Sequence, residues 1–236
     1  YRCPPAPYER ACMIAEVFKR NKVNGRVIIL DPKPDIAPKG PGFRAAYEQV
    51  YLGLVEYVPN ATIKEVDPVK KVIKTTAGDF KFDDANLVPP HQAGSLVWMA
   101  DLIAKDKEGK PTGWADQDPL TFQAKADPYV FLVGDVVSGV PYPKSGHMAN
   151  SQGKIVAKII AGRIAGKEVK PTLPDNTCYS MVNGSPQEAI VINVTYEYNE
   201  KEKKIVPKPK AINERSQALA KATYEWAKSM YRDMFA

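Results

Sequence analysis

The sequence is poor in the residues that build metal centres and disulfide frameworks. Its 236 residues include three cysteines and two histidines. Cys3, Cys12 and Cys178 have neither the paired spacing of a zinc site nor the density of a disulfide scaffold, so we expect no metal site. Composition permits any one of three cysteine pairings with one thiol left over. Composition alone favours buried free thiols, because an unpaired cysteine commonly behaves as a small hydrophobic residue.

The sequence also lacks a long apolar run, a targeting segment and a concentrated charge. No stretch of about 18 apolar residues occurs, so we expect no membrane span. The chain starts with Tyr-Arg-Cys-Pro-Pro, which has no apolar signal-peptide core, and this start favours a fragment or processed chain with any targeting signal upstream. The net charge of +6 comes from scattered basic residues without a recognisable nucleic-acid module. We therefore expect no nucleic-acid partner.

A glycine-rich phosphate loop is missing at the start of the chain. An amphipathic helix is predicted over 8–22 and a buried strand over 27–30 that ends at Asp31, as in the later part of a dinucleotide-binding unit. Where a pyridine-nucleotide domain carries G-x-G-x-x-G, this chain has Cys-Pro-Pro-Ala-Pro-Tyr-Glu. Prolines delete the N–H donors that hold a pyrophosphate, and their rings block its approach. We expect a domain shaped like an NAD site that does not bind NAD, in which Asp31 only ends a strand.

What the sequence does contain is an organising stretch over 129–162. The run Tyr129–Val133 is short, apolar and rich in β-branched residues, which predicts a buried strand. Gly134 allows a ligand to approach the backbone, and Asp135 places a carboxylate at the carboxyl end of the strand, where open α/β sheets bind ligands. An ordinary β-turn acid is the alternative interpretation of Asp135.

A long helix follows this strand. Ser145 is a candidate N-cap, and apolar or large residues follow it at helical spacing: Met148, Gln152, Ile155, Val156, Ile159, Ile160 and Ile164. A helix that opens with Lys144, Ser145 and Gly146 aims free N–H groups and a positive dipole end at the mouth of the same sheet.

Coarser signals place the remaining elements. A second helix is predicted over 42–53 and a third over 93–105, and the last helix over 213–235, capped by Asn213. Short strands are predicted over 55–58, 71–75 and 80–82 as an antiparallel layer, then over 86–90, 177–182 and 189–198, with a proline-broken edge over 205–210. Residues 167–175 are the clearest boundary. His91 is a possible proton shuttle, although a solvated or hydrogen-bonded histidine is favoured.

These motifs carry a resemblance to a known family. The strand, Gly-Asp and Pro-Lys-Ser-Gly-X-X-Ala-Asn-Ser-Gln-Gly-Lys resemble the second FAD-binding half of the two-dinucleotide-domain flavoproteins. Together with Tyr-Arg-Cys-Pro-Pro and Asn-Thr-Cys-Tyr-Ser, they are most similar to the flavoprotein subunit of flavocytochrome c sulfide dehydrogenase. The resemblance covers nearly all of this chain, but this chain corresponds only to the C-terminal portion of the family's proteins. The glycine-rich N-terminal FAD-binding half is expected as a further part of the same protein.

The resemblance implies an α/β fold of the disulfide-reductase type, partial, with a small C-terminal α+β domain. Its expected domains are a nucleotide-fold domain without a glycine loop at 1–84, the C-terminal half of the FAD-binding domain at 85–166, and an interface domain at 167–236. In the family, the Gly134–Asp135 position holds the ribityl chain of FAD, and the helix start at Lys144, Ser145 and Gly146 faces the pyrimidine edge. Trp226 matches a tryptophan close to the flavin, although a core or interface aromatic is as good an interpretation.

The resemblance also changes the interpretation of the cysteines. Cys3 and Cys178 match the redox-active disulfide pair of the family, which lies across the flavin face and takes up sulfide. Cys12 is then the spare thiol. The prolines after Cys3 are expected to fix it in an extended conformation, outside the following helix.

The function implied is a periplasmic sulfide dehydrogenase flavoprotein in electron transport. Electrons would pass from sulfide through the Cys3/Cys178 disulfide to FAD, and then to a cytochrome c subunit that bears the haem. Two alternatives stay open: a sulfide:quinone or NADH-linked flavoprotein reductase, and a non-catalytic flavoprotein-like module that only binds a partner.

Overall fold

The computed structural model describes residues 3–138, 140–170 and 172–235. Its helices are α1 (Ala6–Asn21), α2 (Gly40–Gln49), α3 (Ser95–Met99), the 3-10 turn η1 (Gly134–Val136), α4 (Gly146–Ile164) and α5 (Gln217–Phe235). Its strands are β1 (Val27–Leu30), β2 (Val55–Val58), β3 (Ile63–Asp67), β4 (Val72–Thr75), β5 (Gly78–Lys81), β6 (Ile103–Lys105), β7 (Pro111–Ala115), β8 (Asn176–Gly184), β9 (Gln187–Asn199) and β10 (Lys204–Ser216). None of the described helices has the length and apolar character needed to cross a membrane.

The N-terminal unit follows the predicted helix and strand closely. A proline in the first turn suits the start of α1, because the N–H that proline lacks has no partner there in any case. The strand β1 pairs in parallel with β2, and α2 provides the crossover between them. The prediction that 55–58 belongs to an antiparallel layer is therefore wrong, since the crossover makes both strands run the same way. That layer exists without β2, in the order β3-β4-β5.

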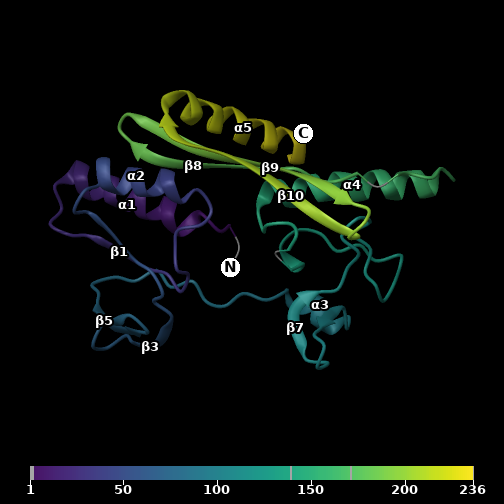
Figure 1. Cartoon of the computed structure of the whole chain (residues 1–236), viewed down its shortest axis with the longest axis horizontal. Coiled ribbons are helices and arrows are strands. Elements are labelled where there is room, and N and C mark those ends of the chain that lie inside the picture. The colour runs from purple at the N-terminus through teal and green to yellow at the C-terminus, as the bar shows by residue number, and fades with distance from the viewer. Residues whose placement is uncertain (1–2, 139, 171, 236) are drawn as a thin grey trace.

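The C-terminal part is a three-stranded antiparallel sheet in the order β10-β9-β8. Figure 1 shows α1 and α2 on one side of this sheet and α5 on the other. The first half of β9 is consequently buried on both faces, with Ile190 and Val191 almost inaccessible. The predicted alternation of buried and exposed residues holds only from Asn193 onward.

The start of the last helix differs from the prediction. Asn213 lies within β10 and caps nothing, because the edge strand continues to Ser216. The hydroxyl of Ser216 instead accepts a hydrogen bond from the backbone N–H of Leu219, at 3.2 Å, in the first turn of α5.

Three other predicted elements are not regular. Residues 86–90 are irregular. Residues 129–133 form a single bridge, between Gln123 and Phe131, because the segment that pairs with this run, 122–124, is too short to form a regular strand. The predicted helix over 93–105 is limited to α3. It ends before Asp101, which has a positive φ of 53°, and the chain then pairs as β6 with β7.

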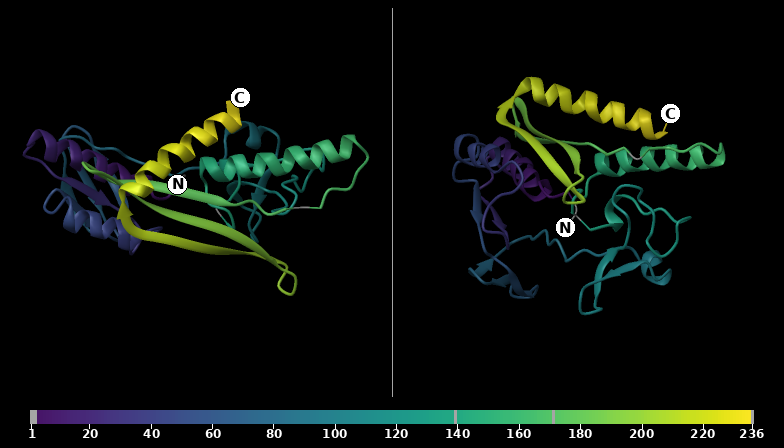
Figure 2. Two further views of the ribbon diagram at one scale, coloured as in Figure 1. Left: turned by 90° about the horizontal axis from the view of Figure 1, so that it is seen from above. Right: turned by 45° about the vertical axis from the view of Figure 1, so that its right-hand side comes forward.

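The C-terminal sheet contributes to two of the hydrophobic cores. Val182 and Ile190 pack with α1, β1 and α2, whereas Val194 and Tyr196 pack with α4. Figure 2 shows α4 and α5 running side by side, and Asp233 of α5 forms an ion pair with Lys154 of α4. This arrangement places β8 between α1 and the start of α4. The expected domain boundaries stay a prediction.

Candidate functional site

The start of α4 is built as the sequence predicts. Ser145 has an extended backbone, and its hydroxyl accepts a hydrogen bond from the N–H of Met148 at 3.1 Å. The predicted inner face of α4 is buried except at its end, where Ile160 is partly exposed and Ile164 is 84% exposed. Gly162, between these two isoleucines, is buried, so Ile160 and Ile164 lie beside the buried face of α4 rather than on it.

The Gly134–Asp135 turn packs directly against α4. Gly134 has a φ of 74°, and its N–H donates to the Oε1 of Gln152 at 2.7 Å. A Cβ at Gly134 would lie 3.1 Å from the Cβ of Ala149, so a side chain would push the turn away from the helix. Glycine is therefore required by the close packing of the turn as well as by its backbone conformation.

The buried side chain of Lys144 stabilises the same turn. The side chain is 7% exposed, and its ammonium donates to the backbone carbonyls of Asp135, at 3.2 Å, and Val137. It also lies 3.4 Å from the centre of the Trp114 ring, which is a cation–π contact. Burial lowers the pKa of Lys144 to about 8, against the opposing effect of the Asp135 charge. The side chain thus fixes the turn, and its predicted contact with a cofactor stays a prediction.

Cys3 and Cys178 line one small cavity of about 120 Å³. Ser145, the N-cap of α4, lines it too, so three residues predicted for the site come together. The remaining lining is mostly apolar: Pro4, Pro5, Pro38, Pro143, Asn176, Ile192 and Val194. All three cysteines of the chain are free thiols in the structure, and the Cys3/Cys178 disulfide stays a prediction. The cavity has room for a few molecules the size of water, but not for a flavin ring.

The backbone of Cys3 is not extended, contrary to the prediction from the prolines. Its φ is 51°, in the left-handed region. Hydrogen bonds hold this conformation, because the N–H of Cys3 donates to the carbonyl of Lys144 at 2.8 Å and its own carbonyl accepts from Ala6 at 2.9 Å. The first of these bonds ties the start of the chain to the loop before α4, which brings Cys3 to the cavity.

Cys178 is placed by the alternation of strand β8. Cys178 and Ser180 point toward the Lys39 side chain, whereas Tyr179 points the other way and contacts Trp226 of α5, with ring centroids 5.7 Å apart. Burial raises the pKa of the Cys178 thiol, and the nearby Lys39 charge opposes that shift.

Cys12 has a different environment from the other two cysteines. It is fully buried in the core beneath α1, and burial raises the pKa of its thiol far above the ordinary value. Such a thiol is chemically inert, which agrees with its predicted place as the spare cysteine.

Lys39 and Glu9 also belong to the site, although no sequence motif indicates them. The Lys39 ammonium donates to the Ser180 hydroxyl at 2.7 Å and to the Cys178 carbonyl at 3.0 Å, and lies 3.8 Å from the Cys178 sulfur. Glu9 accepts a hydrogen bond from the N–H of Met181 at 2.8 Å, and burial raises the pKa of its carboxyl. Lys39 lies directly before α2, which begins at Gly40 rather than at the predicted residue 42, so no signal in the sequence indicated its role.

An aromatic cluster lies at the start of α4, on the other side of β8. The rings of Trp226 and His147 stack with centroids 6.1 Å apart, and His147 accepts a hydrogen bond from the N–H of Thr177 at 3.3 Å. The structure therefore brings Trp226 to the helix start that carries Ser145 and Gly146. His91, by contrast, lies in the irregular segment between β5 and α3.

Two buried donors near this helix start fit the flavin that the resemblance implies. The Nε1 of Trp226 and the Nε2 of Gln152 are buried and have no hydrogen-bond partner among the described residues. An unpaired buried donor is unfavourable unless a ligand or partner supplies an acceptor. The pyrimidine side of a flavin carries carbonyl acceptors, which such donors suit, and the predicted contact of Trp226 with the cofactor stays a prediction.

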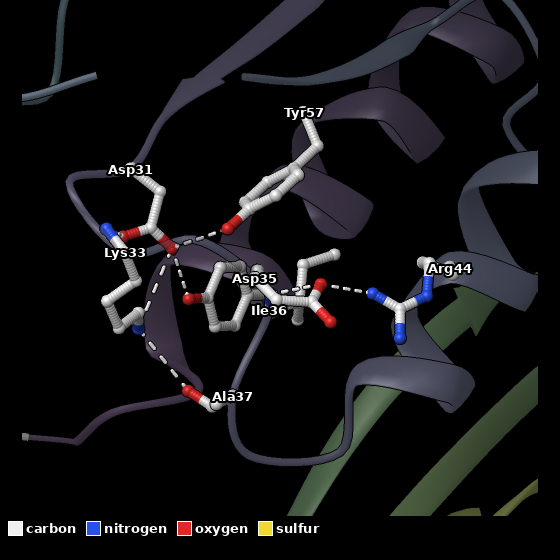
Figure 3. Close-up of polar contacts among 8 residues, drawn as sticks. Asp31, Lys33, Asp35, Ile36, Ala37, Arg44 and Tyr57 are labelled. Atoms are coloured by element: carbon white, nitrogen blue, oxygen red, sulfur yellow. Dashed lines mark hydrogen bonds and ion pairs between the residues drawn. The ribbon is translucent and has the colours of Figure 1, made fainter. Parts of the chain in front are cut away.

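The end of β1, where a nucleotide-binding unit would hold a ribose, is occupied by protein groups. Figure 3 shows Asp31 among Lys33 and Tyr57. Its buried carboxylate accepts from the hydroxyls of Tyr8 at 2.5 Å and Tyr57 at 3.1 Å, and from the N–H of Lys33 at 3.0 Å. Asp31 thus ends its strand as predicted, and its oxygens are already used by neighbours.

No metal site is found in the described ranges, because no three His, Cys, Asp or Glu residues there are grouped to hold an ion.

The candidate site is the cavity of Cys3 and Cys178, with Lys39 behind it and the start of α4 at its edge.

Known folds resemble this arrangement at low sequence identity. The HOCl-induced flavoprotein disulfide reductase RclA of Escherichia coli matches 79% of this chain with a TM-score of 0.52 and 14% identity. A chain of the Tetrahymena thermophila mitochondrial ATP synthase matches 71% with a TM-score of 0.51 and 14% identity. This chain spans 43% and 41% of those two chains, respectively. The fold is that of a flavoprotein disulfide reductase, in part, with a small C-terminal domain.

Family models identify the chain more specifically. Residues 1–89 match the central part of the sulfide dehydrogenase [flavocytochrome c] flavoprotein chain. Residues 171–235 match the flavin-binding model of flavocytochrome c sulphide dehydrogenase, which supports FAD as the cofactor. The two matches together span about two thirds of the sequence and include both Cys3 and Cys178. The chain therefore belongs to the family of flavocytochrome c sulfide dehydrogenase flavoproteins.

Proposed function

We propose that this protein oxidises sulfide through a disulfide between Cys3 and Cys178. One observation carries the proposal: two cysteines far apart in the sequence line the same cavity of about 120 Å³. The cavity suits a small nucleophile such as sulfide, and its apolar wall limits competing attack by water. Family membership supports this assignment of the substrate.

The proposed step is a thiol–disulfide exchange. A hydrosulfide ion attacks one sulfur of the Cys3–Cys178 bond, the S–S bond breaks, and the second sulfur leaves as a thiolate that takes the bond's electron pair. The attacked cysteine then carries a persulfide. Sulfide is oxidised and the protein disulfide is reduced, so no further oxidant is needed for this step.

FAD, when bound, supplies the acceptor for the two electrons held by the reduced pair. We assign Gln152 and Trp226 to binding on its pyrimidine side, and Gly134, Asp135, Lys144, Ser145 and Gly146 to the turn and helix start that support it. A haem-bearing cytochrome c subunit is the proposed next acceptor, and the periplasm is the proposed location.

The proposed disulfide is tested by peptide mapping. We expect the oxidised whole flavoprotein, digested without reductant, to give a Cys3–Cys178 cross-linked peptide and Cys12 as a free thiol. Sulfide should open this link before the flavin absorbance falls. A Cys3–Cys12 link, or three free thiols in fully oxidised and active enzyme, would remove the mechanism.

The NADH-linked alternative makes a different prediction. We expect neither NADH nor NADPH to reduce the flavin at a useful rate. Prolines replace the phosphate-binding glycines, and the Asp31 carboxylate is already bound by Tyr8 and Tyr57. The measurement is an anaerobic titration followed at the flavin absorbance, with dithionite as the positive control. Rapid bleaching by stoichiometric NADH would make the reductase the better assignment.

A further inference from the structure

The backbone conformation and the helix start at position 39 both disfavour lysine. It precedes the first residue of α2 with a φ of 62°, and its side chain makes no capping hydrogen bond. A non-glycine residue in this backbone region is strained, and a cation near a helix N-terminus opposes the helix dipole. The helix start alone therefore gives no reason for lysine.

The side chain of Lys39 is nevertheless buried against β8, with 4% exposure. Its three donors have three acceptors there: the Ser180 hydroxyl, the Cys178 carbonyl and the Cys178 sulfur. Within the described part of the chain, no carboxylate lies within ion-pair distance of Lys39. A buried ammonium is unfavourable unless anions compensate it. Glu9, which shares the Ser180 hydroxyl with Lys39, supplies part of this compensation, and an anion on the Cys178 sulfur would supply it in direct contact.

We propose that Lys39 is a positioning residue that stabilises Cys178 as the thiolate and so makes Cys178, rather than Cys3, the sulfur that leaves when the pair is opened. The proposal rests on the proposed function. Its geometric basis is an asymmetry. Lys39 contacts the sulfur of Cys178 at 3.8 Å and donates to the carbonyl of the same residue, whereas the hydrogen bonds that hold Cys3 to other described residues are those of its backbone.

The charged groups around Cys178 leave Lys39 as its counter-cation. From α1, Glu9 faces it and disfavours a thiolate, and a charge on Cys178 in turn raises the pKa of the Cys3 thiol. From α4, His147 contacts the neighbouring backbone N–H rather than the sulfur. Burial raises the pKa of both site cysteines, and Lys39 is the group that opposes this at Cys178 through its charge and a hydrogen bond.

The exchange step then has a direction. Hydrosulfide bonds to the Cys3 sulfur, the S–S bond breaks, and its electron pair goes to Cys178, which becomes the thiolate beside the Lys39 ammonium. Cys3 keeps the incoming sulfur as a persulfide. A leaving thiol with a lower pKa leaves faster, so Lys39 would accelerate opening.

The test compares Lys39→Gln, Lys39→Arg and Lys39→Gly in the whole flavoprotein. After reduction, each cysteine is alkylated with iodoacetamide between pH 6 and 11 and quantified by peptide mass spectrometry. The control is Lys22→Gln, because Lys22 is exposed and has a similar φ of 53°. We expect Lys39→Gln to raise the alkylation midpoint of Cys178 by about one pH unit or more, with a smaller shift at Cys3. Lys39→Arg should retain most of the original midpoint.

Lys39→Gly is the second variant, used in case Lys39→Gln does not fold. Glycine relieves the backbone strain at this position while it removes the amine. It should shift Cys178 as Lys39→Gln does. An unchanged Cys178 midpoint in folded Gln or Gly variants, or an equal shift at both cysteines, overturns the proposal. The alkylation readout does not need sulfide as substrate, so it stays valid if sulfide fails to reduce the wild-type flavin. In that case the proposed function fails, while Lys39 is still judged by the midpoints.

Discussion

Cys178→Ser is expected to abolish reduction of the flavin by sulfide while leaving reduction by dithionite intact. Serine cannot form the disulfide that hydrosulfide attacks, so the two-electron step at the protein is lost rather than slowed. We expect a fall of about 10³-fold or more in the rate of sulfide-dependent bleaching, as for removal of a covalent catalytic group. Anaerobic stopped-flow absorbance of the whole flavoprotein measures both reactions.

Cys12→Ser is the matched control, because Cys12 lies in the core away from the cavity. It should retain sulfide-dependent reduction even if the buried hydroxyl lowers stability. Cys3→Ser should behave like Cys178→Ser. Full activity in both site variants would favour the non-catalytic or differently acting flavoprotein module instead.

Gly42→Val is expected to destabilise the fold more than other changes on α2. A Cβ at Gly42 would lie 2.8 Å from Ile190 and 3.0 Å from the backbone oxygen of Asn213. The helix therefore meets the β9–β10 pair with no space between them, and a larger side chain must push α2 from the sheet. We expect the free energy of unfolding to fall by about 3 kcal/mol, measured by urea denaturation.

Gly153→Ala provides the comparison for this prediction. Gly153 is also helical, in α4, but a Cβ there would meet nothing within 4 Å. Alanine should raise the free energy of unfolding by up to about 1 kcal/mol, because it is the better helix former. Equal effects of the two substitutions would mean that α2 does not pack on the sheet as described.

The sequence predicted those parts of the fold whose signals are local. The cap at Ser145, the helix over 8–22 and the strand that ends at Asp31 depend on neighbouring residues and on apolar periodicity, and all three are confirmed. The Gly134 turn depends on a glycine that adopts a positive φ, which is again a property of one residue.

Features that depend on distant residues were not predictable in this way. The left-handed backbone of Cys3 is set by a hydrogen bond to Lys144, far along the chain, which overrides the extended preference before proline. Lys39 reaches Cys178 only because α2 and β8 pack together in space. The run 129–133 has strand composition, but a strand also needs a neighbour, which composition does not supply.

Because the two faces of β8 carry different residues of the site, the site depends on the register in which β8 pairs with β9. Cys178 pairs with Ile192 of β9, and its immediate neighbour Tyr179 faces the opposite side toward Trp226. A slip by a single residue would exchange the two faces, so that the tyrosine ring entered the cavity and the thiol met the tryptophan. An insertion or deletion in the short connection between β8 and β9 would therefore separate the two cysteines even though neither had been changed.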